Sequence, residues 1–144
     1  DLSFIQKIPH IHIMDTGGMK GRREELLREE VHDILTHHFG VSKIHSEYGM
    51  TELLSQSCSQ GDGLFFPKMT MQILLRDIND PFQLYTYGET AKTGVFNFFD
   101  LANIDSCAFI ETQDLGRFGT QDSSFYVMGR FDNSDIRGCS LMVI

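Results

Sequence analysis

Apolar and polar positions follow two different periods along the chain, so the chain divides into two parts. Within residues 1–55, a short apolar run at 10–14 predicts a strand, and apolar residues at helical spacing over 22–39 predict a helix. Gly40 favours the end of that helix, and residues 41–48 predict a second short strand. Because the connections are short, this order predicts a parallel pair of strands with a right-handed crossover.

The second part of the chain has no helical period. Turn clusters rich in glycine, asparagine and aspartate separate strand-like segments at 69–76, 83–87, 94–99, 106–112 and 124–128. These segments predict an antiparallel sheet or a small barrel. The expected fold class is therefore α+β, in a single module over 1–144 whose two parts, 1–55 (α/β) and 56–144 (β-rich), share one core.

Composition limits the partners and the compartment. Among 144 residues, 12 Lys plus Arg stand against 20 Asp plus Glu, which gives a formal charge of −8. Nucleic acids and anionic membranes favour basic surfaces, so we expect neither as the main partner. No apolar run approaches the ~20 residues of a membrane-spanning helix. Three cysteines, an odd number without a close pair, do not indicate a disulfide framework, which favours the cytoplasm.

Candidate chemistry follows the two predicted parallel strands, because ligands in such sheets bind beyond the carboxyl ends of the strands. The turns there are polar and contain glycine: Asp-Thr-Gly-Gly at 15–18 and Tyr-Gly-Met-Thr-Glu at 48–52. Two polar turns at one edge of one sheet indicate a binding site.

The turn at 48–52 has the residue types that a nucleotide needs. The ring of Tyr48 can stack on a flat base, and Gly49 allows the backbone to approach a ligand closely. The hydroxyl of Thr51 can bond a phosphate, and the carboxylate of Glu52 can hold a metal that bridges phosphates. Ordinary turn chemistry and a solvated Glu52 would explain the same residues without a ligand.

Two later stretches fit the same ligand. Residues 112–118 follow a predicted strand and are expected to expose Asp114 in a turn, and residues 129–132 (Gly-Arg-Phe-Asp) contain Arg130. A carboxylate can accept both vicinal hydroxyls of a ribose, and an arginine can bond and offset phosphate charge. Alternatively, Asp114 shapes a turn and Arg130 covers the surface.

The order of these motifs resembles the adenylate-forming superfamily, which includes acyl-CoA synthetases and phenylacetate-CoA ligases. The nearest branch is the LuxE-like acyl-protein synthetases, and the resemblance covers residues 14–140. It implies that the chain is part of the main domain of such an enzyme. The implied activity is ATP-dependent conversion of a carboxylic acid, with a fatty acid favoured, to acyl-AMP, followed by transfer to a thiol. The resemblance further implies ATP or AMP, Mg²⁺ and an acyl-donor or acyl-acceptor protein as partners.

The resemblance also implies roles for single residues. In that family a Gly-Gly turn and a tyrosine pack on adenine, a threonine bonds the α-phosphate, an aspartate binds the ribose hydroxyls and an arginine contacts ribose or phosphate. The residues matched to these roles motif by motif are Gly17, Gly18, Tyr48, Gly49, Thr51, Asp114 and Arg130. Glu52 is matched to the Mg²⁺ ligand and, with Thr51, to the catalytic step.

Cys139 matches the place near the C-terminus where the acyl-protein synthetase branch is acylated. A thiolate attacks a mixed anhydride to form a thioester, and the neighbouring Arg137 favours the thiolate. A small buried cysteine in a terminal strand is the alternative.

Parts of the family pattern do not occur in the sequence. The upstream phosphate loop is not found, and neither is the lid with its lysine; the chain also begins at Asp1, without Met. The resemblance therefore implies the C-terminal part of a longer enzyme, inactive or nearly so by itself. The competing hypothesis is a non-catalytic module that binds a nucleotide or a partner protein.

Two other patterns lead to different functions. Asp15-Thr16-Gly17 after two apolar residues also fits a retroviral-type aspartic protease, in which each subunit of a homodimer supplies one aspartate. The long helix predicted after Gly18 counts against it, because that protease is nearly all β.

Histidines offer a zinc alternative. His10 and His12 share one face of the first predicted strand, and His45 lies on the neighbouring strand. Three imidazoles can bind zinc, although histidines at such spacing are more often exposed or satisfied locally.

Overall fold

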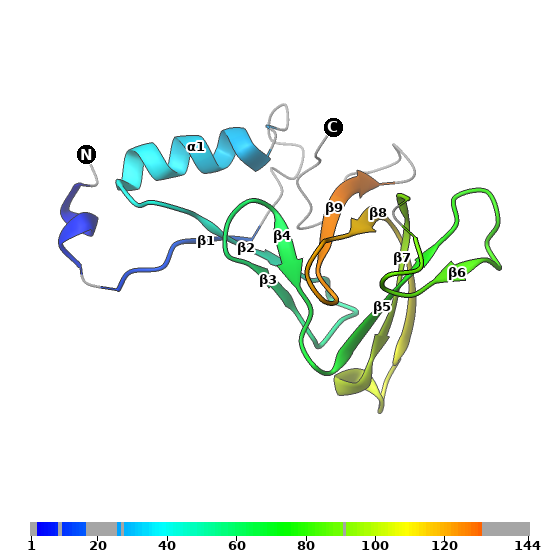
Figure 1. Cartoon of the computed structure of the whole chain (residues 1–144). Coiled ribbons are helices and arrows are strands. Elements are labelled where there is room, and N and C mark those ends of the chain that lie inside the picture. The colour runs from blue at the N-terminus through cyan, green and yellow to red at the C-terminus, as the bar shows by residue number, and fades with distance from the viewer. Residues whose placement is uncertain (1–2, 9, 17–25, 27, 91, 131–144) are drawn as a thin grey trace.

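A computed structural model describes residues 3–8, 10–16, 26, 28–90 and 92–130. The described residues form one mixed sheet of nine strands with one α-helix, α1 (Arg28–Phe39), against it (Figure 1). Two 3-10 helices, η1 (Ser3–Lys7) and η2 (Leu101–Asn103), complete the helical elements of this part of the chain. None of these helices is long and apolar enough to cross a membrane.

The sheet runs through both compositional parts of the chain. Its order is β1-β2-β3-β4-β9-β8-β7-β5-β6, so the β2–β3 pair joins the two parts. The strands, in chain order, are β1 (Met14–Asp15), β2 (His45–Tyr48), β3 (Ser57–Ser59), β4 (Leu64–Phe66), β5 (Met71–Arg76), β6 (Leu84–Tyr85), β7 (Gly94–Asp100), β8 (Phe109–Phe118) and β9 (Phe125–Arg130).

The predicted order of strand, helix and strand is confirmed, although β1 (Met14–Asp15) overlaps the strand expected at 10–14 only at Met14. Strands β1 and β2 pair in parallel, with Met14 opposite His45, and the His45 amide donates to the Ile13 carbonyl at 2.8 Å. Gly40 ends α1 with a φ of 64°, a left-handed conformation that glycine adopts without steric cost. The start expected for the helix, at 22, falls outside the described residues.

Helix α1 lies over β1 and β2 and contacts them through polar side chains (Figure 1). His32 Nε2 is 3.0 Å from the Ser46 hydroxyl and 3.8 Å from the Asp15 carboxylate. At the helix start, the Arg28 guanidinium lies 5.0 Å from the centre of the Phe65 ring. These contacts hold α1 against Asp15 of β1, Ser46 of β2 and Phe65 of β4.

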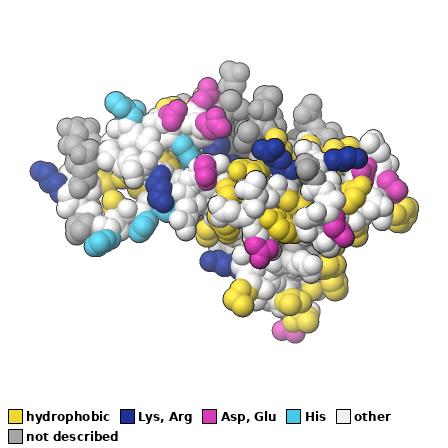
Figure 2. Space-filling model, viewed as in Figure 1, with side chains coloured by type: hydrophobic (Ala, Val, Ile, Leu, Met, Phe, Trp, Pro, Cys, Tyr) yellow, Lys and Arg dark blue, Asp and Glu magenta, His cyan; other side chains and the backbone are white. Residues whose placement is uncertain are grey.

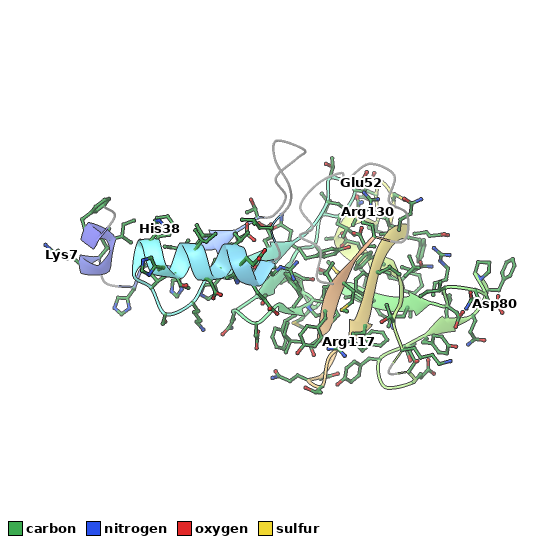
Figure 3. All side chains as sticks on the ribbon, turned by 90° about the horizontal axis from the view of Figure 1, so that it is seen from above. Lys7, His38, Glu52, Asp80, Arg117 and Arg130 are labelled. Atoms are coloured by element: carbon green, nitrogen blue, oxygen red, sulfur yellow. The ribbon has the colours of Figure 1, made fainter. Side chains whose placement is uncertain are left out.

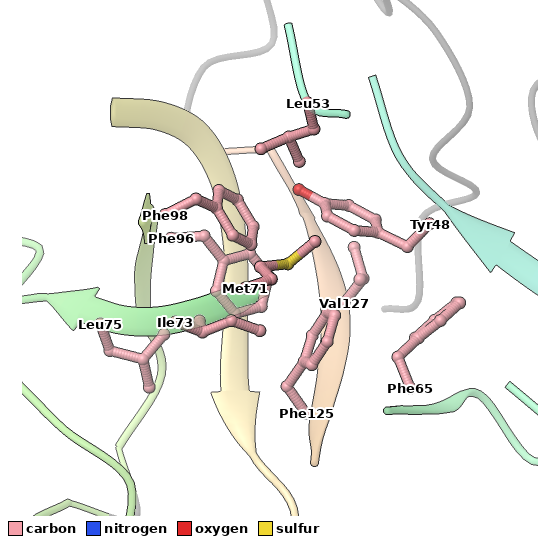
Figure 4. Packing of buried hydrophobic residues seen from close by; sticks show 10 residues of the cluster. All are labelled: Tyr48, Leu53, Phe65, Met71, Ile73, Leu75, Phe96, Phe98, Phe125 and Val127. Carbon is pink, nitrogen blue, oxygen red and sulfur yellow. The ribbon is translucent and has the colours of Figure 1, made fainter. Parts of the chain in front are cut away.

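The core forms where the sheet curls and brings distant strands together (Figure 4). Tyr48, from β2, packs against aromatic rings of β4, β7 and β9, with centroids 5.6–6.1 Å apart. Burial of each large apolar side chain contributes about 1.5–3 kcal/mol. The buried cluster consists of Tyr48, Leu53, Phe65, Met71, Ile73, Leu75, Phe96, Phe98, Phe125 and Val127.

Candidate functional site

Three of the predicted nucleotide-binding residues meet in space, although they come from distant parts of the chain. The Tyr48 hydroxyl donates to Asp114 Oδ2 at 2.7 Å, across 66 positions of sequence. Arg130 Nε lies 3.4 Å from Asp114 Oδ1. We call this group the Tyr48–Asp114–Arg130 cluster. It joins β2, β8 and β9.

A β-bulge places Arg130 beside Asp114. Along most of the β8–β9 pair, the register sets Gly116 opposite Val127, but beyond a shift at Leu115 it sets Asp114 opposite Arg130. Directly opposed residues share one face of an antiparallel pair, and the extra residue changes which side chain faces inward. Gly129, at the shift, has a φ of 132°, a backbone conformation that residues other than glycine rarely adopt.

The structure corrects the expected setting of Asp114. The sequence predicted an exposed carboxylate in a turn after a strand, but Asp114 lies inside β8 and is 7% exposed. The strand continues through this polar position because Tyr48 and Arg130 supply partners for the carboxylate. Arg130 is also placed differently from the prediction, which ended the strand at 128: Arg130 is the last residue of β9.

The expected stacking of Tyr48 on adenine does not fit this structure. Tyr48 is 1% exposed, and its ring is in contact with four phenylalanine rings, so no face of it is open to a base. What the side chain does instead is hold Asp114 through its hydroxyl. The burial and the neighbouring carboxylate raise the Tyr48 pKa well above its usual value, so the hydroxyl remains a donor.

Asp114 should give the protein an unusual pH dependence. Burial raises its pKa, and neither the Tyr48 hydrogen bond nor the Arg130 charge fully offsets this. For an acid whose folded pKa exceeds the unfolded value of about 3.9, the contribution to stability is complete below that pH and is lost as pH rises through the folded pKa. Urea unfolding at several pH values should therefore show Asp114→Asn becoming more stable relative to wild type as pH rises through that window. A difference that is independent of pH would contradict the assignment.

Thr51 and Glu52 lie in a turn after β2, and both side chains are exposed. The Leu53 amide closes the turn by donating to Met50 at 3.1 Å, and the Asn103 side chain donates to the Glu52 carbonyl at 2.8 Å. Figure 3 shows Glu52 and Arg130 on the sheet, between Lys7 at one end of the view and Asp80 at the other. The turn thus presents a hydroxyl and a carboxylate to solvent on an anchored backbone.

Asp100 anchors the same turn, and the sequence analysis did not single it out. The residue is fully buried, yet its carboxylate accepts the amides of Leu54 and Ser55 at 2.8 and 2.9 Å and the Ser55 hydroxyl at 2.6 Å. It also caps η2 through the Ala102 amide at 3.1 Å. A carboxylate at the end of the apolar run Gly94–Phe99 was the available signal.

The described residues offer limited means of holding a metal. They contain no group of three or more His, Cys, Asp or Glu side chains that could enclose an ion. Mg²⁺ is commonly held by one or two carboxylates together with substrate phosphates, so the exposed Glu52 is compatible with it. The expected zinc trio is not formed, because His10 does not join His12 and His45 in such a group.

Other predicted site residues are placed differently or fall outside the described part. Gly49 follows β2, and the position where its Cβ would stand is 3.2 Å from the Gln56 side chain. Asp15, the aspartate of the protease alternative, lies in β1 and faces His32 of α1. A helix packed against this aspartate gives no support to a protease that is nearly all β. Gly17, Gly18 and Cys139 lie outside the described residues.

Comparison with known proteins adds no family to this geometry, since no protein-family model matches the chain and no curated protein matches it.

Proposed function

We propose that this chain is the nucleotide-binding part of an acyl-adenylate-forming enzyme of the LuxE-like, acyl-protein synthetase type. The observation that carries the proposal is the Tyr48–Asp114–Arg130 cluster, in which residues from three separate motifs meet at 2.7 and 3.4 Å. If these three residues only shaped separate turns, their side chains would have no reason to meet. The resemblance described above supplies the reaction, and the geometry supports a common site.

In the proposed site, each residue acts on a different part of the nucleotide. Asp114 accepts a hydrogen bond from Tyr48 through Oδ2 and forms an ion pair with Arg130 through Oδ1, and its remaining lone pairs can accept ribose hydroxyls. The Arg130 guanidinium carries further donors for ribose or phosphate. Tyr48 is a positioning residue that orients Asp114 rather than a platform for adenine.

Thr51 and Glu52 complete the phosphate side of the proposal. The exposed Thr51 hydroxyl can donate to the α-phosphate, and Glu52 would hold Mg²⁺, which offsets phosphate charge when bound. The substrate carboxylate attacks the α-phosphorus of ATP, giving acyl-AMP and pyrophosphate. A thiolate, proposed to be that of Cys139, then attacks the acyl carbon, so that a thioester forms and AMP leaves.

A second candidate is a non-catalytic module that binds a nucleotide or a partner protein. It is favoured by one observation: the buried Asp114 carboxylate already has internal partners, as a purely structural cluster would. The two candidates predict different results in the same experiments.

The first experiment measures AMP and MgATP binding to the chain by calorimetry. Loss of a charge-assisted hydrogen bond costs about 1.5–3 kcal/mol, so Thr51→Ala should weaken AMP binding about 10-fold or more. Glu52→Gln should weaken MgATP but leave AMP nearly unchanged. Both side chains are exposed, so folding should be preserved; Glu29→Gln, exposed on α1, is the matched control. No nucleotide binding by the wild type would refute the proposal.

The second experiment separates the two candidates. Carboxylate-dependent exchange between ATP and pyrophosphate, and a hydroxylamine-labile acyl adduct absent from Cys139→Ser, are expected of the enzyme. Nucleotide binding without exchange in the full-length protein would support the non-catalytic module. An adduct that persists in Cys139→Ser would remove the role of that cysteine.

A further inference from the structure

Two histidine rings, one from the segment just before β1 and one from the first residue of β2, meet at the α1 end of the molecule, where Figure 2 shows several histidine side chains at the surface. His12 Nδ1 lies 3.3 Å from His45 Nε2, with ring centroids 5.2 Å apart and planes at 70°. The β1–β2 backbone pairing fixes their separation, because the amide of His45 itself bonds the carbonyl of Ile13.

The pair lies on the face of the sheet opposite to the core. Ser46 and Tyr48 of β2 are buried beneath α1 and in the aromatic core, so the alternating residue His45 points the other way. His12 is exposed and His45 half-buried. The two rings are therefore accessible, and they are separate from the Tyr48–Asp114–Arg130 cluster.

The spacing of the two nitrogens fits a shared metal ion. In a tetrahedral site with Zn–N bonds of about 2.0–2.1 Å, two nitrogen ligands stand about 3.3–3.4 Å apart. We propose that His12 and His45 bind one Zn²⁺ or a similar divalent transition-metal ion through Nδ1 and Nε2, with water or an external ligand at the other positions.

The surroundings of His45 support this site. A hydrogen bond with the Ser59 backbone orients the ring, as outer partners do for histidines that bind metals.

Two protein ligands predict an exchangeable ion rather than a structural one. Structural zinc sites usually have four protein ligands, and the described residues form no group of even three. The affinity order for imidazole sites predicts tighter binding of Cu²⁺ than of Zn²⁺. A chelator should remove the ion without unfolding the chain.

Calorimetric titration of the chain with Zn²⁺ at neutral pH tests the site. We expect one ion per chain, with binding weakened at least 10-fold in His12→Ala and in His45→Ala. His45→Gln serves as a second variant that keeps a polar side chain at the half-buried position. His10→Ala, an exposed histidine two residues before His12, is the matched control and should bind as wild type.

Three results would overturn the proposal. One is the absence of Zn²⁺ binding by the wild type, which would identify the contact as an N–H···N hydrogen bond between the rings. Another is equal binding by His12→Ala and wild type. The third is an equal loss in His10→Ala or in His38→Ala, because the ion would then be held by other histidines.

Discussion

Replacing Asp100 by alanine should lower the free energy of unfolding by about 3–5 kcal/mol, since each buried donor left without a partner costs about 1–3 kcal/mol. The substitution removes the acceptor for the amides of Leu54, Ser55 and Ala102 and for the Ser55 hydroxyl. The Ser55 hydroxyl keeps Thr70 Oγ1 as a neighbour at 2.6 Å, but the three amides lose the fully buried carboxylate that accepts from them. Urea unfolding of the full chain at neutral pH measures the loss.

The control is Asp105→Ala, an exposed carboxylate in the turn after η2. Exposed substitutions of this kind usually change stability by less than about 0.5 kcal/mol. A loss below about 1 kcal/mol for Asp100→Ala would show that water satisfies these amides and that the network is not a structural anchor.

The pH dependence of the Asp100 contribution should run opposite to that of Asp114. Burial raises the Asp100 pKa, but the hydrogen bonds from Ser55, Leu54 and Ala102 outweigh it, so the pKa is lowered overall. An acid with a lowered folded pKa stabilises the protein above the unfolded value of about 3.9, and this contribution is lost as pH falls through the folded pKa. The destabilisation by Asp100→Ala should therefore diminish in acid.

The spacing of apolar residues along the sequence predicted those elements in which apolar side chains are buried at regular intervals. The parallel β1–β2 pair and strands β5, β7 and β9 were found where apolar residues recur. Strands β3 and β4 were both missed. The apolar run of β4 (Leu64–Phe66) is only three residues long, and the inward positions of β3 are Ser57 and Ser59, which are fully buried although polar. Ser59 bonds the Gly61 carbonyl, so hydrogen bonding, and not apolar character, allows its burial.

The sequence motifs named the members of the Tyr48–Asp114–Arg130 cluster but did not predict their arrangement. Sequence motifs selected Tyr48, Asp114 and Arg130, yet their contact depends on the curl of the sheet and on the bulge at Gly129. Both are tertiary features with no local periodic signal. The same reason explains why Asp114 was predicted in a turn: its partners lie on other strands.

Replacing Tyr48 by alanine should cost about 3–5 kcal/mol of stability, the range for truncating a buried aromatic side chain. The ring contacts Phe65, Phe96, Phe98 and Phe125, so its removal leaves a cavity at the centre of the core. A tyrosine whose main purpose was to stack on adenine would instead be dispensable for folding. Urea unfolding without nucleotide distinguishes the two cases, and wild-type stability of Tyr48→Ala would contradict the core role.

The hydroxyl should contribute separately from the ring. Tyr48→Phe keeps the packing but removes the donor to the buried Asp114 carboxylate, at a cost of about 1–3 kcal/mol. In a double-mutant cycle with Asp114→Asn, the two losses should not add, because both variants alter one hydrogen bond. Tyr126→Phe, a half-buried tyrosine beneath Arg117, is the matched control and should change stability little. If Tyr48→Phe also weakens AMP binding and Tyr126→Phe does not, Tyr48 acts on the nucleotide through Asp114. If the losses in stability are additive and AMP binding is unchanged, the role of Tyr48 is limited to the core.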